Sequence, residues 1–102
     1  MEDIFVPSDI KLNVNIAPES GATMDDFDFS VEVFTSPVRA LTFKKEDTVR
    51  VDENNYFVPL HTGDLPPGRI TIRTIAFIPD PDMPNGIKRD AKKIETDYNI
   101  VY

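Results

Sequence analysis

Apolar and polar residues alternate with a period of two along most of this chain, the pattern of β-strands with one buried and one solvent-exposed face. The longest alternating stretch covers residues 68–78, where Ile70, Ile72, Thr74, Ala76 and Ile78 share one face. Proline-rich turns flank it, so we expect the central strand of an all-β domain. Further strands are expected over residues 10–16, 27–33, 38–44, 49–51, 55–60 and 94–100, and residues 87–93 are expected to form a strand, with a helical turn as the alternative.

Proline, glycine and asparagine mark the connections between these stretches. Pro66-Pro67-Gly68 precedes the long strand, and Pro84-Asn85-Gly86 lies in the link that follows it. Residues 52–55 are expected to form a tight hairpin, because asparagine tolerates a positive φ. About seven strands at intervals of roughly 8–14 residues predict an immunoglobulin-like antiparallel β-sandwich. A small β-barrel is the alternative architecture.

The length and charge of the chain narrow the classes of protein to which it belongs. Its 102 residues are enough for one domain, so we expect a single sandwich over 1–102. The net charge of −7 disfavours nucleic acids and anionic membranes as partners, because both are polyanions. No stretch approaches the roughly 20 apolar residues of a membrane span. The N-terminus is acidic, which is not typical of a signal peptide, so we expect synthesis in the cytoplasm.

Acidic and basic residues are unevenly distributed. The first third is acidic apart from Lys11, and basic residues gather over 39–50 and again over 88–93. One interpretation is that these are solvated turns and outer faces. The other is that acidic and basic parts of neighbouring copies meet in an assembly.

No group of residues indicates catalysis or a resident metal ion. His61 is the only histidine, no nucleophile lies in an elbow motif, and the chain has no cysteine. We therefore expect a protein that is not an enzyme and has no cofactor. The segments 25–28 and 80–85 carry carboxylates that suit Ca²⁺, but neither has the spacing of an EF-hand, and turn formation explains both.

Two kinds of segment are candidate contact surfaces. The loop 79–86 is braced by proline and glycine, and its Met83 is expected either to plug one end of the sandwich or to be an exposed contact. The two termini are apolar and β-prone, and we expect them to pair, either inside the sandwich or with an open sheet edge of another subunit. The candidate interaction residues are Ile4, Phe5, Val6, Pro79, Asp80, Asp82, Met83, Tyr98, Ile100 and Tyr102.

The order of segments resembles a group of small phage proteins. A strand ending in Phe34-Thr35 is followed by a short basic strand, then by Tyr56-Phe57-Val58, and then by the long strand after Leu65-Pro66-Pro67-Gly68. The most specific parts of the resemblance are the segments IPDPDMPNGI at 78–87 and ETDYNIV at 95–101. From about residue 27 onward the chain is similar to β-sandwich structural proteins of tailed phages and prophages of gut anaerobes, including crAss-like phages. More distantly, it is similar to the N-terminal domain of phage upper baseplate proteins.

The resemblance implies a structural protein of the virion without catalytic residues. We expect a tail, baseplate or fibre-attachment module that acts through protein–protein contacts and is present in many copies in a symmetric assembly. Its partners would be other virion proteins of the tail, fibre or capsid. A head-decoration protein and a free-standing carbohydrate-binding module are the alternatives.

Overall fold

A computed structural model describes residues 2–36 and 39–102. The chain is all-β, as its alternating pattern predicts, and the only helices in the described part are two short 3₁₀ turns, η1 (Lys45–Asp47) and η2 (Thr62–Asp64). The expected strand start at Val38 lies outside the described residues. The strands are β1 (Glu2–Phe5), β2 (Asp9–Val14), β3 (Asp28–Ser36), β4 (Arg39–Lys44), β5 (Val49–Asp52), β6 (Asn55–His61), β7 (Gly68–Pro79) and β8 (Ile87–Val101).

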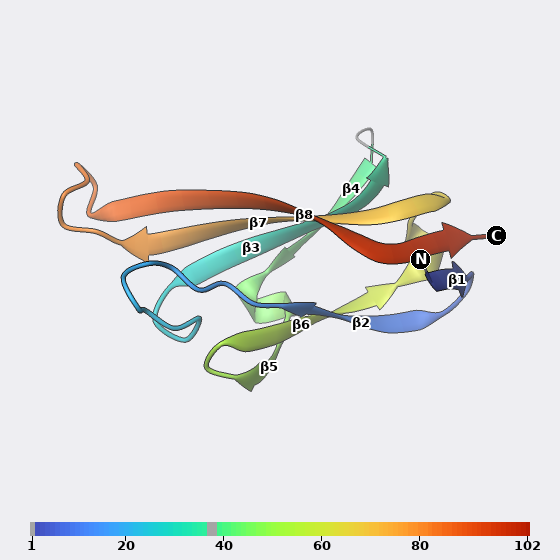
Figure 1. Cartoon of the computed structure of the whole chain (residues 1–102), viewed down its shortest axis with the longest axis horizontal. Helices are drawn as coiled ribbons and strands as arrows, with labels where there is room; N and C mark the ends of the chain where they lie inside the picture. The colour runs from blue at the N-terminus through green and yellow to red at the C-terminus, as the bar shows by residue number, and fades with distance from the viewer. Residues whose placement is uncertain (1, 37–38) are drawn as a thin grey trace.

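The strands form two sheets that pack as a sandwich (Figure 1). The larger sheet has the order β1-β8-β7-β3-β4, and the smaller has the order β2-β6-β5. The division of the strands between the two sheets, and their order within each sheet, are those of a variable-type immunoglobulin domain. The sandwich is therefore immunoglobulin-like. The described part contains eight strands: β1 is added to the expected stretches, and the stretches 87–93 and 94–100 form a single strand. The pairing of β1 with β8 is parallel, whereas the other strand pairs are antiparallel.

The core lies between the two sheets and is filled by the inward faces that the alternation predicts. On β7, Ile70, Ile72, Ala76 and Ile78 are buried, as expected. Tyr56, Val58 and Leu60 on β6 oppose them from the smaller sheet and are buried as well. Ile4, Leu12, Val14, Ile16, Met24, Phe27, Phe29, Val31, Val33, Leu65 and Ile100 complete the buried apolar cluster.

The hairpin between β5 and β6 forms where it was expected, but not for the expected reason. Among the described residues, no residue other than glycine has a positive φ. The Asp52 carboxylate instead accepts hydrogen bonds from the Asn54 backbone N–H at 2.9 Å and from the Asn55 side-chain amide at 3.0 Å. The side chain of an aspartate thus stabilises the turn in place of a left-handed backbone.

The stretches 87–93 and 94–100 form one continuous strand, β8. Its pairing with β7 is interrupted by a register shift, since Asn99 pairs with Arg69 while Glu95 pairs with Thr71. The Thr96 hydroxyl lies at this bulge and donates to the Ile70 carbonyl at 2.8 Å. The bulge divides β8 into a first part, most of whose residues are exposed, and a last part that reaches the core at Ile100.

The molecule is elongated, with principal extents of 47 × 28 × 22 Å. The turn between β7 and β8 lies at one end of the long axis, and both termini lie near the other (Figure 1). Beyond the part that pairs with β1, β8 is an edge strand of the larger sheet.

Candidate functional site

The predicted contact residues fall into two groups at opposite ends of the sandwich (Figure 1). We call them the terminal cluster, made of Ile4, Phe5, Val6, Tyr98, Ile100 and Tyr102, and the loop cluster, made of Pro79, Asp80, Asp82 and Met83. They are separated by the length of the β7–β8 hairpin, so the fold does not bring them into one site.

The terminal cluster is held together by pairing between the two ends of the same chain. Ile4 of β1 lies opposite Ile100 of β8, and both side chains are in the core. The Val6 backbone N–H donates to the Val101 carbonyl at 3.0 Å. Phe5 and Tyr102 remain at the surface, with 66% and 67% of their areas exposed. The apolar termini therefore serve the sandwich itself, and whether Phe5 and Tyr102 also contact another subunit stays a prediction.

The loop cluster is a compact turn with its own hydrogen bonds. The Asp80 backbone N–H donates to the Gly86 carbonyl at 2.9 Å, and the Gly86 N–H donates to the Met83 carbonyl at 2.9 Å. The Asp80 carboxylate also accepts from the Asp82 backbone N–H at 2.9 Å. Met83 is 41% exposed and so does not plug the sandwich. Met24, by contrast, is fully buried in the core, and its backbone N–H donates to the Glu53 carbonyl at 2.8 Å.

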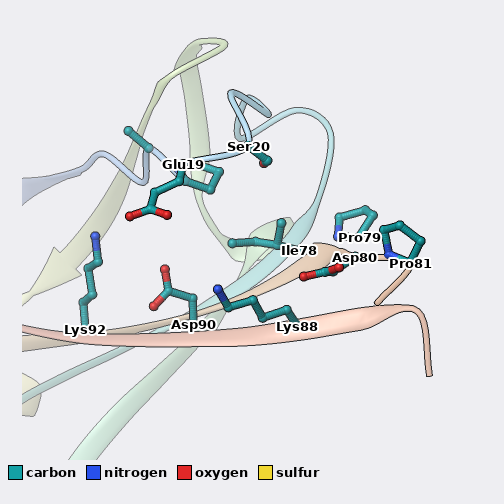
Figure 2. A pocket seen from close by; sticks show the side chains of 11 residues that line it. Glu19, Ser20, Ile78, Pro79, Asp80, Pro81, Lys88, Asp90 and Lys92 are labelled. Carbon is teal, nitrogen blue, oxygen red and sulfur yellow. The ribbon is translucent and has the colours of Figure 1, made fainter. Parts of the chain in front are cut away.

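A cleft of about 540 Å³ lies beside the loop cluster (Figure 2). Ile78 of β7 lines it, together with Lys88, Asp90 and Lys92 of β8. The opposite wall is the segment 17–20, with Glu19 pointing toward the β8 side chains in Figure 2. Nothing in the sequence indicates this cleft directly. The alternation of β8 places Lys88, Asp90 and Lys92 on one face, but only the packing shows that the smaller sheet leaves that face uncovered.

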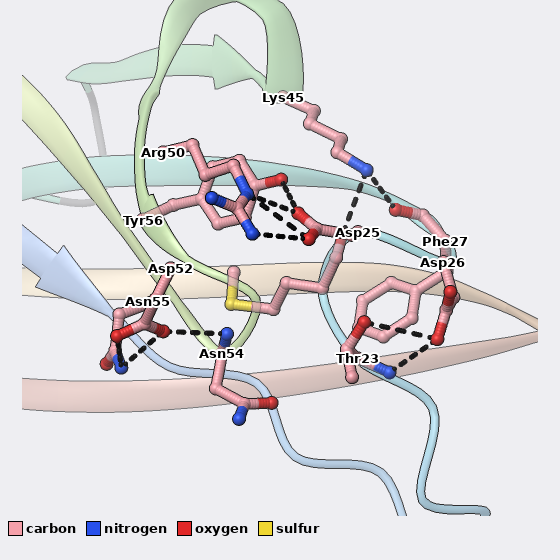
Figure 3. A network of polar contacts seen from close by, with 11 residues as sticks. Thr23, Asp25, Asp26, Phe27, Lys45, Arg50, Asp52, Asn54, Asn55 and Tyr56 are labelled. Atoms are coloured by element: carbon pink, nitrogen blue, oxygen red, sulfur yellow. Dashed lines mark hydrogen bonds and ion pairs between the residues drawn. The ribbon is translucent and has the colours of Figure 1, made fainter.

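A polar network joins the segment before β3 to the smaller sheet (Figure 3). Arg50 Nη2 and Nε lie 2.9 and 3.0 Å from Asp25 Oδ2 and Oδ1, and the Tyr56 hydroxyl donates to Asp25 Oδ1 at 2.5 Å. Hydrogen bonds from Arg50 and then from Tyr56 lower the pKa of Asp25 to about 2. Hydrogen bonding to this carboxylate also raises the pKa of Tyr56. The network anchors the segment to β5 and β6, because Asp25 is bonded to Arg50 of β5 and to Tyr56 of β6.

Lys45 of η1 anchors the same segment from the other side. Its ammonium group donates to the carbonyls of Met24 and Phe27 at 2.8 and 2.9 Å, and it lies 5.8 Å from the ring centres of both Phe29 and Tyr56. These contacts combine charge-assisted hydrogen bonds with two cation–π interactions. The segment from Met24 to Phe27 is therefore held against the core, into which its two end residues are buried.

The acidic residues of the segment 25–28 do not converge on a common point. Asp25 binds Arg50 and Tyr56, whereas the Asp26 carboxylate accepts from the Thr23 backbone N–H at 2.9 Å. Asp28 accepts from the Phe29 backbone N–H at 2.9 Å. Across residues 2–36 and 39–102, no three acidic or histidine side chains are placed to hold a metal ion.

His61 is the last residue of β6, and it is exposed. Its ring pairs with the Asp9 carboxylate of β2. Two hydroxyl groups lie nearby in the sequence but are turned to the backbone: Ser8 donates to the Phe5 carbonyl at 2.6 Å, and Thr62 donates to the Ser8 carbonyl at 2.8 Å. The histidine–aspartate pair therefore joins two strands without a hydroxyl nucleophile bonded to it.

No protein-family model, curated protein or solved structure matches this chain. The described part contains no helix long and apolar enough to cross a membrane.

Proposed function

We propose that the protein is a non-enzymatic structural component of a tailed-phage virion, serving as a tail, baseplate or fibre-attachment module. The observation that carries the proposal is the placement of the two candidate contact clusters at opposite ends of an elongated sandwich. Such a domain can contact one neighbour through its terminal end and another through its loop end. The segments 78–87 and 95–101, on which the resemblance to phage proteins rests, form the distal loop and the last part of β8, so one lies at each end.

The two ends are suited to rigid contacts. At the loop end, internal hydrogen bonds hold the turn with Met83 exposed, so little conformational entropy is lost on binding. At the terminal end, Phe5 is an exposed aromatic side chain on a strand whose neighbour Ile4 is in the core. An exposed aromatic group on a fixed backbone is a common anchor of protein–protein interfaces.

The proposal is tested by locating the protein in purified particles. An antibody to this chain should label the tail or baseplate in negative-stain images, in several symmetry-related copies. Labelling over the capsid would identify a head-decoration protein instead. Absence from particles, together with binding of this chain on a glycan array, would favour the carbohydrate-binding alternative.

Contact through each end is tested by incorporation of surface variants into particles. Phe5→Ser and Met83→Ser alter exposed side chains, so both proteins should fold like the parent chain. We expect each to enter particles less efficiently. Glu46→Ser, which alters an exposed residue of η1 away from both ends, is the control and should be incorporated normally. Normal incorporation of both end variants would contradict the proposed contacts.

A further inference from the structure

One edge of the larger sheet is open over most of its length. β8 pairs with β7 from Ile87 to Ile100, but β1 covers its other side only from Tyr98 to Val101. Residues 87–97, which we call the β8 edge, therefore have a strand neighbour on one side only within the described part of the chain. Every side chain from Ile87 to Glu95 is exposed except that of Asp90, which is half-buried. An edge of this kind presents unpaired backbone donors and acceptors to another strand.

The β8 edge carries positive charge on an otherwise acidic protein. Four basic side chains lie on it, and none of them makes an ion pair within residues 2–36 and 39–102. Two carboxylates at its far end are compensated internally, because Arg69 lies 3.5 Å from Glu95 and 3.6 Å from Asp97. The four cations without an ion pair in the described part of the chain are Lys88, Arg89, Lys92 and Lys93, of which Arg89 lies 5.7 Å from the centre of the Phe77 ring.

The inner side of the β8 edge opens into the cleft of Figure 2. Lys88 and Lys92 line that cleft, and Ile94, on the same face of the strand, is 47% exposed. A strand added beside β8 would point alternate side chains to this face. Acidic side chains there would meet Lys88 and Lys92, an uncharged one would lie opposite Asp90 between them, and an apolar one would cover Ile94.

We propose that the β8 edge binds an extended acidic segment of another protein by β-strand addition. Backbone hydrogen bonds supply the pairing, and carboxylates opposite the unpaired cations supply selectivity. This inference deepens the proposed function, on which it rests for the setting, by naming the surface and the chemistry of a partner. The β8 edge is then a third contact surface, in addition to the two ends of the sandwich.

A second copy of the same edge does not fit this surface. Two-fold antiparallel pairing places like charges opposite each other when it is centred on Asp90, Lys92 or Lys93, and centring it on Ala91 places Arg89 opposite Lys93. Centring it on Ile94 would require space that β1 already occupies beside residues 98–101. The basic side chains therefore oppose self-association while leaving the edge open to an acidic strand.

The test uses the full chain and a defined probe. The probe is a peptide of about ten residues in which Glu-Glu pairs alternate with Val-Val pairs, a β-prone sequence whose two faces each alternate acidic and apolar side chains. A peptide with lysine in place of glutamate is the control ligand. Titration into isotope-labelled protein, followed by NMR, measures both the affinity and the amides that respond. Sedimentation of the protein alone measures its oligomeric state.

We expect saturable binding of the glutamate peptide, with shifts concentrated on the amides of residues 87–97, and a monomer in its absence. The double variant Lys92→Glu/Lys93→Glu should bind it at least ten-fold more weakly, and Ile94→Ser should also weaken binding. Lys11→Glu/Lys44→Glu makes the same change in net charge on β2 and β4 and should bind like the parent chain. Circular dichroism confirms that each variant is folded.

Several results would overturn the inference. They are no saturable binding, equal binding of the lysine peptide, shifts confined to the edges β2, β4 or β5, and self-association through the β8 edge. The proposed virion role is separable from these results. If the protein binds the acidic peptide but is absent from particles, only the virion role is disproved. If the antibody labels the tail but the protein does not bind the peptide, only the proposed binding at the β8 edge is disproved.

Discussion

Ile72 and Ile94 lie directly opposite each other on β7 and β8, on the same face of the larger sheet, yet Ile72 is 4% exposed and Ile94 is 47% exposed. The smaller sheet covers β7 but leaves this part of β8 open, so two adjacent isoleucines have different environments. The boundary of the core passes between them.

This difference predicts unequal effects of the same substitution. We expect Ile72→Ala to lower the free energy of unfolding by about 2–5 kcal/mol, because it leaves a cavity in the packed core. Ile94→Ala is the matched control and should change it by no more than about 0.5 kcal/mol. Chemical denaturation of both variants measures the two values. Equal effects would mean that the smaller sheet covers β8 as well as β7.

The ion pair between Asp25 and Arg50 should stabilise the fold in a pH-dependent way. The pKa of Asp25 is about 2 in the folded protein, below its ordinary value of 3.8. The stabilisation is therefore complete above the unfolded-state pKa and is lost as the pH falls through about 2. We expect the difference in melting temperature between the parent chain and Asp25→Asn to be largest near pH 7 and to shrink toward pH 2.

Asp64→Asn is the control for this pH dependence. Asp64 is exposed, has no ion pair in the described part of the chain, and loses the same charge on substitution. A melting difference for Asp25→Asn that is the same at both pH values, or that matches the control, would contradict the role of the ion pair.

Lys45 should contribute to stability although it is a charged residue near the surface. Lys45→Met removes the two hydrogen bonds to the carbonyls of Met24 and Phe27, and we expect a loss on the order of 2 kcal/mol. Lys44→Met is the control, because Lys44 is exposed and its bond to Asp47 is made by the backbone. Thermal unfolding compares them. A loss no greater than that of the control would show that the carbonyls are equally well solvated without Lys45.

The distal turn requires a glycine at position 86. Gly86 has a φ of +71°, where a Cβ atom strains the backbone even though nothing lies within 4 Å of it. We expect Gly86→Ala to lower the free energy of unfolding by about 1 kcal/mol and to speed hydrogen exchange at Asp80 and Met83. Gly63→Ala is the control, since its φ is not positive and the added Cβ would lie 3.9 Å from Val6. A neutral Gly86→Ala would mean that the turn can adopt another geometry.

The sequence by itself determined the strands and the inward face of β7. Successive side chains of a strand point to opposite faces, so alternation such as that of Ile70, Ile72 and Ile78 records the buried face locally. The hairpin at 52–55 was also predictable, because a turn depends on adjacent residues.

Only the tertiary structure decided which alternating faces are covered and by what. The chain ends pair with each other, and Asp25 meets Arg50, because folding brings segments distant in the sequence together. The cleft opens beside β8 because the smaller sheet does not extend over that strand. Ile94 has the same local pattern as Ile100, yet Ile100 is in the core and Ile94 borders the open edge. Alternation gives the direction of a side chain, and the extent of the opposing sheet gives its burial.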